Sequence, residues 1–311
     1  MDRNVLLFHH THTSDSNRFE REVRGLHIDS HATDYVELAS RLPERQDAIF
    51  VKTEHWKTDP EYFDRLESRL DSKNSNLERF GAHVYFELNG SRVAIINGVE
   101  AAVKQQRNHI TICGLPLETS ETYTALELDE LREIATDAAW IAPAHIGMPF
   151  HYFTPDLMED VCELATEPEV EVALGYTTGY FPLYNRIARN EIPSRTSVNE
   201  YAETFDLPLL PELDLHTAVP EGFSGCGIVE APVMDELQGG EIPVADILNA
   251  DLLRPSECRN GITVGQFLHN YAVFVPFIEE KVDHDRWFER SLPETEWVRN
   301  LDIQANTIQL P

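Results

Sequence analysis

The segment Val5-Leu6-Leu7-Phe8-His9-His10-Thr11-His12 is an apolar run that ends in histidine. Its length and composition predict a buried strand. Because side chains alternate along a strand, His10 and His12 should point the same way, about 7 Å apart along the chain. Two imidazoles at that separation can reach one divalent metal ion. The segment therefore predicts part of a metal site at a strand end.

The same pattern, an apolar run with a histidine or a carboxylate at one end, recurs along the chain. A single histidine of this kind is more often an ordinary core residue. Its repetition favours a shared site. The members are 47–55 ending in His55, 93–100 ending in Glu100, 109–115 beginning with His109, 140–145 ending in His145, and 207–216 ending in Asp214-Leu215-His216.

Helical patterns separate most of these runs, and Asn89-Gly90 predicts a hairpin between 83–88 and 93–96. Strands alternating with helices imply a parallel sheet, and functional side chains at strand C-termini are typical of a closed β/α barrel. We expect residues 1–253 to form this barrel and residues 254–311 to form a helical extension packed on it. We expect a first helix that begins near residue 34. Further helices are expected within 59–80, 126–139, 155–166, 197–205, 244–253 and 263–281.

The charge of the chain is far from balanced, with 54 acidic residues against 25 basic ones and a net charge of -29. The acidic residues are dispersed, which favours a halophilic protein kept soluble in concentrated salt over the alternative, an acidic surface that binds a cationic partner. This charge disfavours stable nonspecific binding to nucleic acid.

No apolar run is long enough for a bilayer, and we expect a cytoplasmic protein without a membrane partner. The four cysteines form no CxxC pair, as in a reduced protein with buried thiols.

The strand-end residues form a set of nitrogen and oxygen ligands, which suits zinc, manganese or iron. Eight ligands exceed the needs of one tetrahedral ion, so we expect two or three divalent metals. Glu100 and Asp214 are the carboxylates that could bridge them. We assign no site role to His9, His83, His151, His269 or His284. The set is His10, His12, His55, Glu100, His109, His145, Asp214 and His216.

The ordered motifs resemble those of the PHP (polymerase and histidinol phosphatase) family. The resemblance covers about residues 5–250, and it implies a distorted (β/α)7 barrel, TIM-like in architecture, with a trinuclear metal site. The matching motifs are His10-Thr11-His12 with Ser14-Asp15, Thr53-Glu54-His55, Gly98-Val99-Glu100, His109, Ala144-His145 and Leu213-Asp214-Leu215-His216.

The chain departs from the family pattern in three places. The spacing from His12 to Ser14-Asp15 is shorter, so the ligand from the first loop could be Asp15 or His31. Glu54 replaces an aspartate that is not a ligand in the family. Leu213 replaces a serine, which could alter the hydrogen bonds around Asp214.

The resemblance implies a hydrolase of phosphate esters, in which a metal-bridging hydroxide attacks phosphorus in line. The substrate would be a phosphomonoester or a short nucleotide or oligonucleotide. Asp214, His216 or His109 would serve in proton transfer. Positive charge for the phosphate could come from Arg18, Lys57 and Arg186.

Two other functions remain open from the sequence. Amidohydrolase barrels share the HxH opening and a strand-end aspartate, but no lysine is placed for a carbamylated bridge, and Glu100 occupies that region. A regulatory module that binds metal without catalysis is the third possibility. The intact ligand set argues against it.

The charge also makes a prediction about stability. Between about 0.01 M and 1 M salt the Debye length falls from about 30 Å to about 3 Å, so repulsion between acidic side chains is screened. We expect the melting temperature to rise over that range, as measured by circular dichroism. A melting temperature that is flat or falling would contradict the halophilic interpretation.

Overall fold

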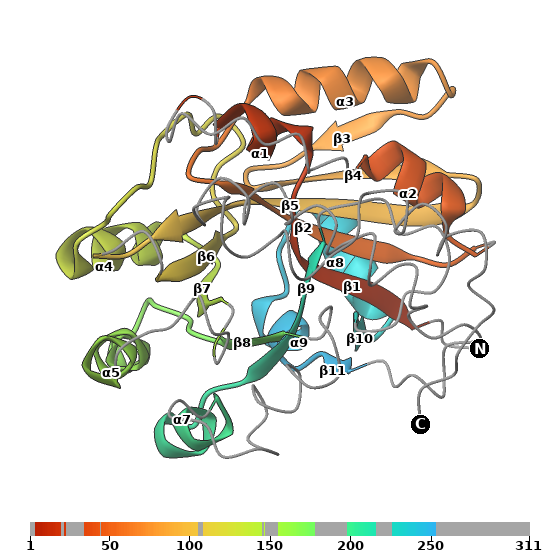
Figure 1. Ribbon diagram of the computed structural model, residues 1–311. Helices are drawn as coiled ribbons and strands as arrows, with labels where there is room; N and C mark the ends of the chain where they lie inside the picture. Colours follow the sequence, from red (N-terminus) through yellow and green to blue (C-terminus); the bar gives the residue numbers. More distant parts are fainter. Residues whose placement is uncertain are drawn as a thin grey trace, which may run out of the picture.

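The computed structural model describes residues 4–19, 22, 34–43, 45–104, 108–144, 146, 155–177, 198–215 and 226–252. At 155, 176, 177, 213–215 and 252 it describes the backbone alone. Within this part of the chain eleven strands form one large sheet with helices packed on it, so the fold is mixed α/β (Figure 1). The predicted C-terminal extension, 254–311, lies outside the described residues.

Parallel strands form the middle of the sheet. The opening apolar run becomes β1, Val5–Thr11, and pairs in parallel with β2, Ala48–His55, on one side and with β9, Leu209–Leu215, on the other. Next to β2 lies β5, Ser91–Ala102, and next to β9 lies β8, Leu174–Thr177, both again parallel. β1 is buried along its whole length, as expected of a strand covered on both faces.

The long strand β5 changes its partner halfway along. Its first half pairs antiparallel with β4, His83–Leu88, through the predicted hairpin, in which Asn89 and Gly90 both have positive φ. β3, Leu77–Arg79, extends this edge. The second half of β5 pairs with β6, His109–Cys113.

The prediction of a parallel sheet is wrong at β6, which runs antiparallel to β5 and to β7, Trp140–Pro143. Residues 103–108 are too few for the crossover that a parallel neighbour needs. As a result, the first residue of β6 lies beside the C-terminal end of β5, where His109 pairs with Ala102.

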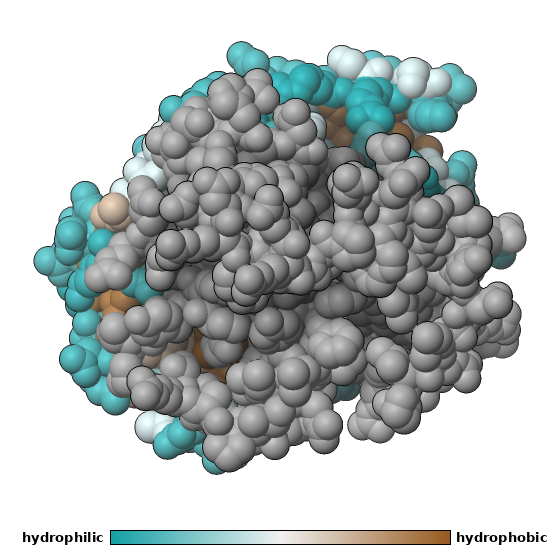
Figure 2. All heavy atoms as spheres, in the orientation of Figure 1, coloured by the Kyte–Doolittle hydropathy of each residue, from teal (hydrophilic) through white to brown (hydrophobic). Residues whose placement is uncertain are grey.

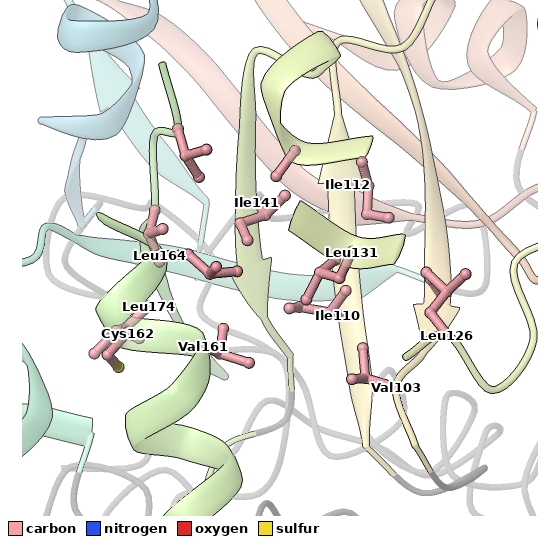
Figure 3. Close-up of a cluster of buried hydrophobic side chains, with 14 of the residues drawn as sticks. Val103, Ile110, Ile112, Leu126, Leu131, Ile141, Val161, Cys162, Leu164 and Leu174 are labelled. Atoms are coloured by element: carbon pink, nitrogen blue, oxygen red, sulfur yellow. The ribbon is translucent and has the colours of Figure 1, made fainter. Parts of the chain in front are cut away.

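Three clusters of buried side chains attach the helices to the sheet. One packs Ile110, Ile112 and Ile141 of the strands against Leu131 and Val161 of the helices on that side (Figure 3). These helices are α4 (Leu128–Asp137), α5 (Pro155–Glu163), the short 3-10 helix η2 (Leu164–Thr166) and α7 (Val198–Phe205).

The second cluster lies under α2, Tyr35–Arg41, and α3, Glu61–Asp71. The third joins the opposite face of β1, β2 and β5 to the segment that follows residue 226. That segment and the short helix after β1 complete the described elements: α1 (Ser14–Phe19), β10 (Gly227–Val229), α8 (Pro232–Gly239), α9 (Val244–Leu248) and β11 (Asp251–Leu252).

The described part of the surface is polar. Where the face in Figure 2 is coloured, its rim is mostly hydrophilic, and the hydrophobic side chains lie in recesses. None of the described helices has the length and apolar character that a membrane span requires.

One glycine permits the close approach of three strands. A Cβ atom on Gly98 would lie 2.5 Å from the carbonyl oxygen of Ile112 and 3.2 Å from that of Lys52. Both are backbone atoms of neighbouring strands, so neither can move aside alone. Gly81 has nothing within 4 Å of its Cβ position.

We therefore expect Gly98→Ala to destabilise the fold by about 1–3 kcal/mol, the usual cost of overpacking. The matched control Gly81→Ala should leave the melting temperature near that of the parent. Thermal unfolding followed by circular dichroism measures both. Equal melting temperatures for the two variants would contradict the close approach of β2, β5 and β6.

Candidate metal centre

The strand ends bring four histidines around one carboxylate. β1 supplies His10 and is followed at once by His12, β2 ends at His55, and β5 carries Glu100. Because β6 is reversed, its first residue, His109, arrives at the same edge of the sheet. Glu100 is fully buried at the centre of this group.

The distances within the group are short. Oε2 of Glu100 lies 3.2 Å from His10 Nε2, 3.4 Å from His12 Nε2 and 3.0 Å from His55 Nε2. Its other oxygen, Oε1, lies 2.5 Å from His109 Nδ1. Ligand atoms of His10, His12 and Glu100 all lie within 4.8 Å of one another.

This donor set fits a metal ion. Two ligand atoms that are each about 2.0–2.1 Å from a tetrahedral ion stand about 3.3–3.4 Å apart, close to the separations between Glu100 and the histidines. Imidazole and carboxylate donors without thiolate suit zinc, manganese and iron. His10, His12 and Glu100 could therefore hold a metal ion, with His55 and His109 adjacent.

A β-bulge in β1 places the histidines on the face of the sheet where Glu100 lies. His10 has a positive φ of 65°, and the register with β2 shifts between Phe8 and Thr11. Phe8 and Thr11 are three residues apart and would face opposite ways in a regular strand. Instead, Phe8 stacks on Phe50 while Thr11 hydrogen-bonds Tyr35, and these partners belong to one cluster. The extra residue thus turns His10 and His12 to the other face.

The electrostatics of the group centre on Glu100. Burial alone would raise the pKa of this carboxyl group, but His109, His10 and His55 hold it well below its usual range. Glu100 can therefore be both charged and fully buried, because imidazoles surround its carboxylate.

The structure adds a residue that the sequence did not single out. Glu212, on β9, is fully buried and contacts Nδ1 of His10. Gly175 makes room for it, because a Cβ atom there would lie 3.0 Å from Glu212 Oε2 and 3.0 Å from the carbonyl oxygen of Pro143. A carboxylate on one ring nitrogen orients a metal-ligating histidine so that its other nitrogen faces the metal.

His9, which the sequence left without a role, lies against the same group. It is buried, its Nε2 is 3.7 Å from the Cys113 sulfur, and its ring is 6.4 Å from that of His10. Burial lowers the pKa of His9 to about 3, although Glu212 opposes the shift. Burial also raises the pKa of the Cys113 thiol. Both side chains are therefore neutral at neutral pH.

Trp56 keeps an unusual backbone conformation directly after His55. Its φ of 63° is rare for a bulky residue and costs about 1–3 kcal/mol. Its N–H donates to the carbonyl oxygen of Glu100 at 2.9 Å, and its ring meets that of His109 edge-on at 4.9 Å. The strained residue thus lies between members of the histidine group.

Asp15 lies in an ionic network of its own. It pairs with Arg65 at 2.6 Å, while Asp59 binds Arg18 at 2.6 Å and Arg65 at 2.9 Å. Burial, and then Glu54, raise the pKa of Asp15 to about 6 against the opposing effects of Lys52 and the two arginines. Asp15 as a metal ligand remains a prediction.

The cations proposed for phosphate binding also have acidic partners. Arg18 pairs with Asp59, and Lys57 lies 3.5 Å from Glu22. Four of the predicted residues, His31, His145, Arg186 and His216, lie outside the described residues. Asp214 lies on β9, but its side chain is outside them too.

Comparison with protein-family models finds no match for this chain, and comparison with curated proteins finds no similar sequence. The functional interpretation therefore depends on the residues and geometry of the site.

The contact between Glu212 and His10 generates a prediction. Glu212→Gln keeps the shape of the side chain but removes the negative charge that supports His10. We expect its affinity for Zn²⁺ or Mn²⁺ to fall about 10–100-fold. Competition with a chelating indicator measures this, and Glu203→Gln, an exposed residue on α7, is the control. An affinity within about threefold of the parent would show that Glu212 does not support a metal ligand.

Proposed function

We propose that this protein is a metal-dependent phosphoesterase built on a distorted (β/α)7 barrel similar to that of the PHP family. The observation that carries the proposal is the buried carboxylate of Glu100 with four histidines around it. Burying so many polar groups costs free energy unless each is hydrogen-bonded, ion-paired or bound to a metal, so a purely structural role for this cluster is disfavoured.

The strand pairings support a barrel. Pairing is continuous from β8 through β9, β1, β2, β5 and β6 to β7. Between β7 and β8 there is one isolated parallel bridge, from Ile141 to Val172. Two hydrogen bonds accompany it, Ile141 N to the Glu171 oxygen and Ala173 N to the Ile141 oxygen, both 2.9 Å. These seven strands would form the ring, closed weakly at this point.

The ring would also place the remaining predicted ligands. β9 pairs with β1 through Leu215 and Thr11, so the end of β9 lies beside the end of β1. Asp214 precedes this contact and His216 follows it. The family resemblance implies that both act with His10 and His12 at the C-terminal mouth of the barrel.

In this mechanism two or three ions of zinc, manganese or iron, when bound, would supply a nucleophile at neutral pH and stabilise the charge of the phosphoryl group. The residues that would hold these ions are His10, His12, His55 and Glu100. Asp214, His216 or His109 accepts the proton released on attack or gives one to the leaving oxygen. His9, Cys113 and Trp140 pack as buried side chains against one another beside the site.

The substrate would be a phosphomonoester or a short nucleotide or oligonucleotide. An amidohydrolase-like reaction finds less support, because the buried lysine near the site, Lys52, contacts Glu54 and Tyr62 and not the histidine group. Assays of manganese-loaded protein in high salt against phosphate esters and amides separate the two. Hydrolysis of amides alone would reject the phosphoesterase, and metal binding without either activity would favour a regulatory module.

For the phosphoesterase, we expect Asp214→Asn to lower catalysis by at least about 10²-fold with the fold retained, because a proton acceptor is lost. Asp246→Asn, which removes the same charge from an exposed position on α9, is the control. Steady-state hydrolysis of the best phosphate ester measures both. Activity of Asp214→Asn within about threefold of the control would exclude Asp214 from the reaction.

A further inference from the structure

Glu54, the residue before His55, is a second buried carboxylate with contacts of its own. It is fully buried on β2 and accepts hydrogen bonds from the start of α1. Thr13 donates its N–H at 3.1 Å to both carboxylate oxygens and its hydroxyl at 2.6 Å to Oε1. Ser16 donates its hydroxyl at 2.5 Å to Oε2. Glu54 thereby fixes the position of α1 directly after His12.

A buried lysine balances the charge of Glu54. Lys52 is fully buried on the same strand, with Nζ 3.6 Å from Glu54 Oε1 and 4.9 Å from the centre of the Tyr62 ring. Among the described residues Nζ has no hydrogen-bond partner. The lysine therefore acts on Glu54 as a nearby charge and leaves the carboxylate oxygens to Thr13 and Ser16.

The hydroxyl of Ser16 connects Glu54 to two of the histidines. Its oxygen accepts the backbone N–H of His55 at 3.0 Å and lies 3.4 Å from His12 Nδ1. A hydroxyl has one proton to donate, and here that proton goes to Glu54. Toward His12, Ser16 can then act only as an acceptor, so the proton between them belongs to Nδ1 of His12.

A proton on Nδ1 leaves Nε2 of His12 with its lone pair, and Nε2 is the atom that faces Glu100. Glu212 has the corresponding position at Nδ1 of His10. The two histidines of the HxH motif are thus each oriented by a carboxylate, His10 directly and His12 through a serine.

We propose that Glu54 and Ser16 form a positioning pair that sets the tautomer of His12 and the place of His55 for metal binding. The proposal rests on the metal centre proposed above. It also gives the glutamate of Thr53-Glu54-His55 a role that the sequence did not assign. Glu54 would act through Ser16 and would not itself be a metal ligand.

The test compares Ser16→Ala and Glu54→Gln with the parent, using Co²⁺ alone as the probe. Ser16→Ala removes the relay but keeps Thr13 and Lys52 on Glu54, so it should fold. We expect its Co²⁺ affinity to fall about 10–100-fold and its visible Co²⁺ spectrum to change, because the ligand geometry changes. The control is Ser40→Ala, whose hydroxyl donates to the Val36 carbonyl oxygen of its own helix.

The double variant Ser16→Ala, Glu54→Gln tests the relay itself. Once Ser16 is absent, Glu54→Gln should lower Co²⁺ affinity little further, although each single variant lowers it. Fully additive losses, or single variants with parental affinity and spectrum, would overturn the positioning pair while leaving the metal centre intact. A parent that binds no Co²⁺ would overturn both this inference and the proposed function.

Discussion

The burial of one carboxylate, that of Glu100, is the constraint on which the arrangement of the strand ends depends. A buried negative charge is costly unless partners compensate it. Here the four histidines come from or directly follow three strands, β1, β2 and β6, and all approach the two oxygens of Glu100 on β5. Any shift in the register of one strand would move its histidine out of reach. The charge therefore links the site to the sheet as a whole.

The backbone shows where this requirement conflicts with regular structure. His10 and Trp56 both have positive φ, and His10 lies in the bulge of β1 whereas Trp56 lies directly after the end of β2. Such conformations persist only where surrounding contacts determine them, and they gather at functional sites. In β1 the bulge changes the face of the histidines. In the segment after β2, Trp56 holds the carbonyl oxygen of Glu100.

Much of the site could be predicted from the sequence, because its residues end apolar runs that are easy to recognise. His10, His12 and Glu100 do meet, and His55 and His109 lie against Glu100. Regular alternation alone does not account for His10 and His12, since it would place them beside Phe8 on the other face. A bulge depends on the register with neighbouring strands, which no local pattern contains. Glu212 and Ser16 were missed because their partners are distant in sequence or contact the ligands indirectly.

In the fold, too, some features follow from local sequence patterns and others do not. The hairpin at Asn89-Gly90 and most strands and helices before residue 215 follow local patterns, whereas the reversal of β6 follows from a short connection. After residue 226, the helix α8 and the strands β10 and β11 were not predicted. The two strands have only two or three residues and therefore carry little periodicity.

X-ray absorption spectroscopy of the zinc- or manganese-loaded protein tests the central claim, that these histidines and Glu100 form one metal centre, most directly. The account predicts a first shell of nitrogen and oxygen at about 2.0–2.1 Å for zinc, with the multiple scattering of several imidazoles and no sulfur. A shell with sulfur at about 2.3 Å, or one without imidazole, would contradict it.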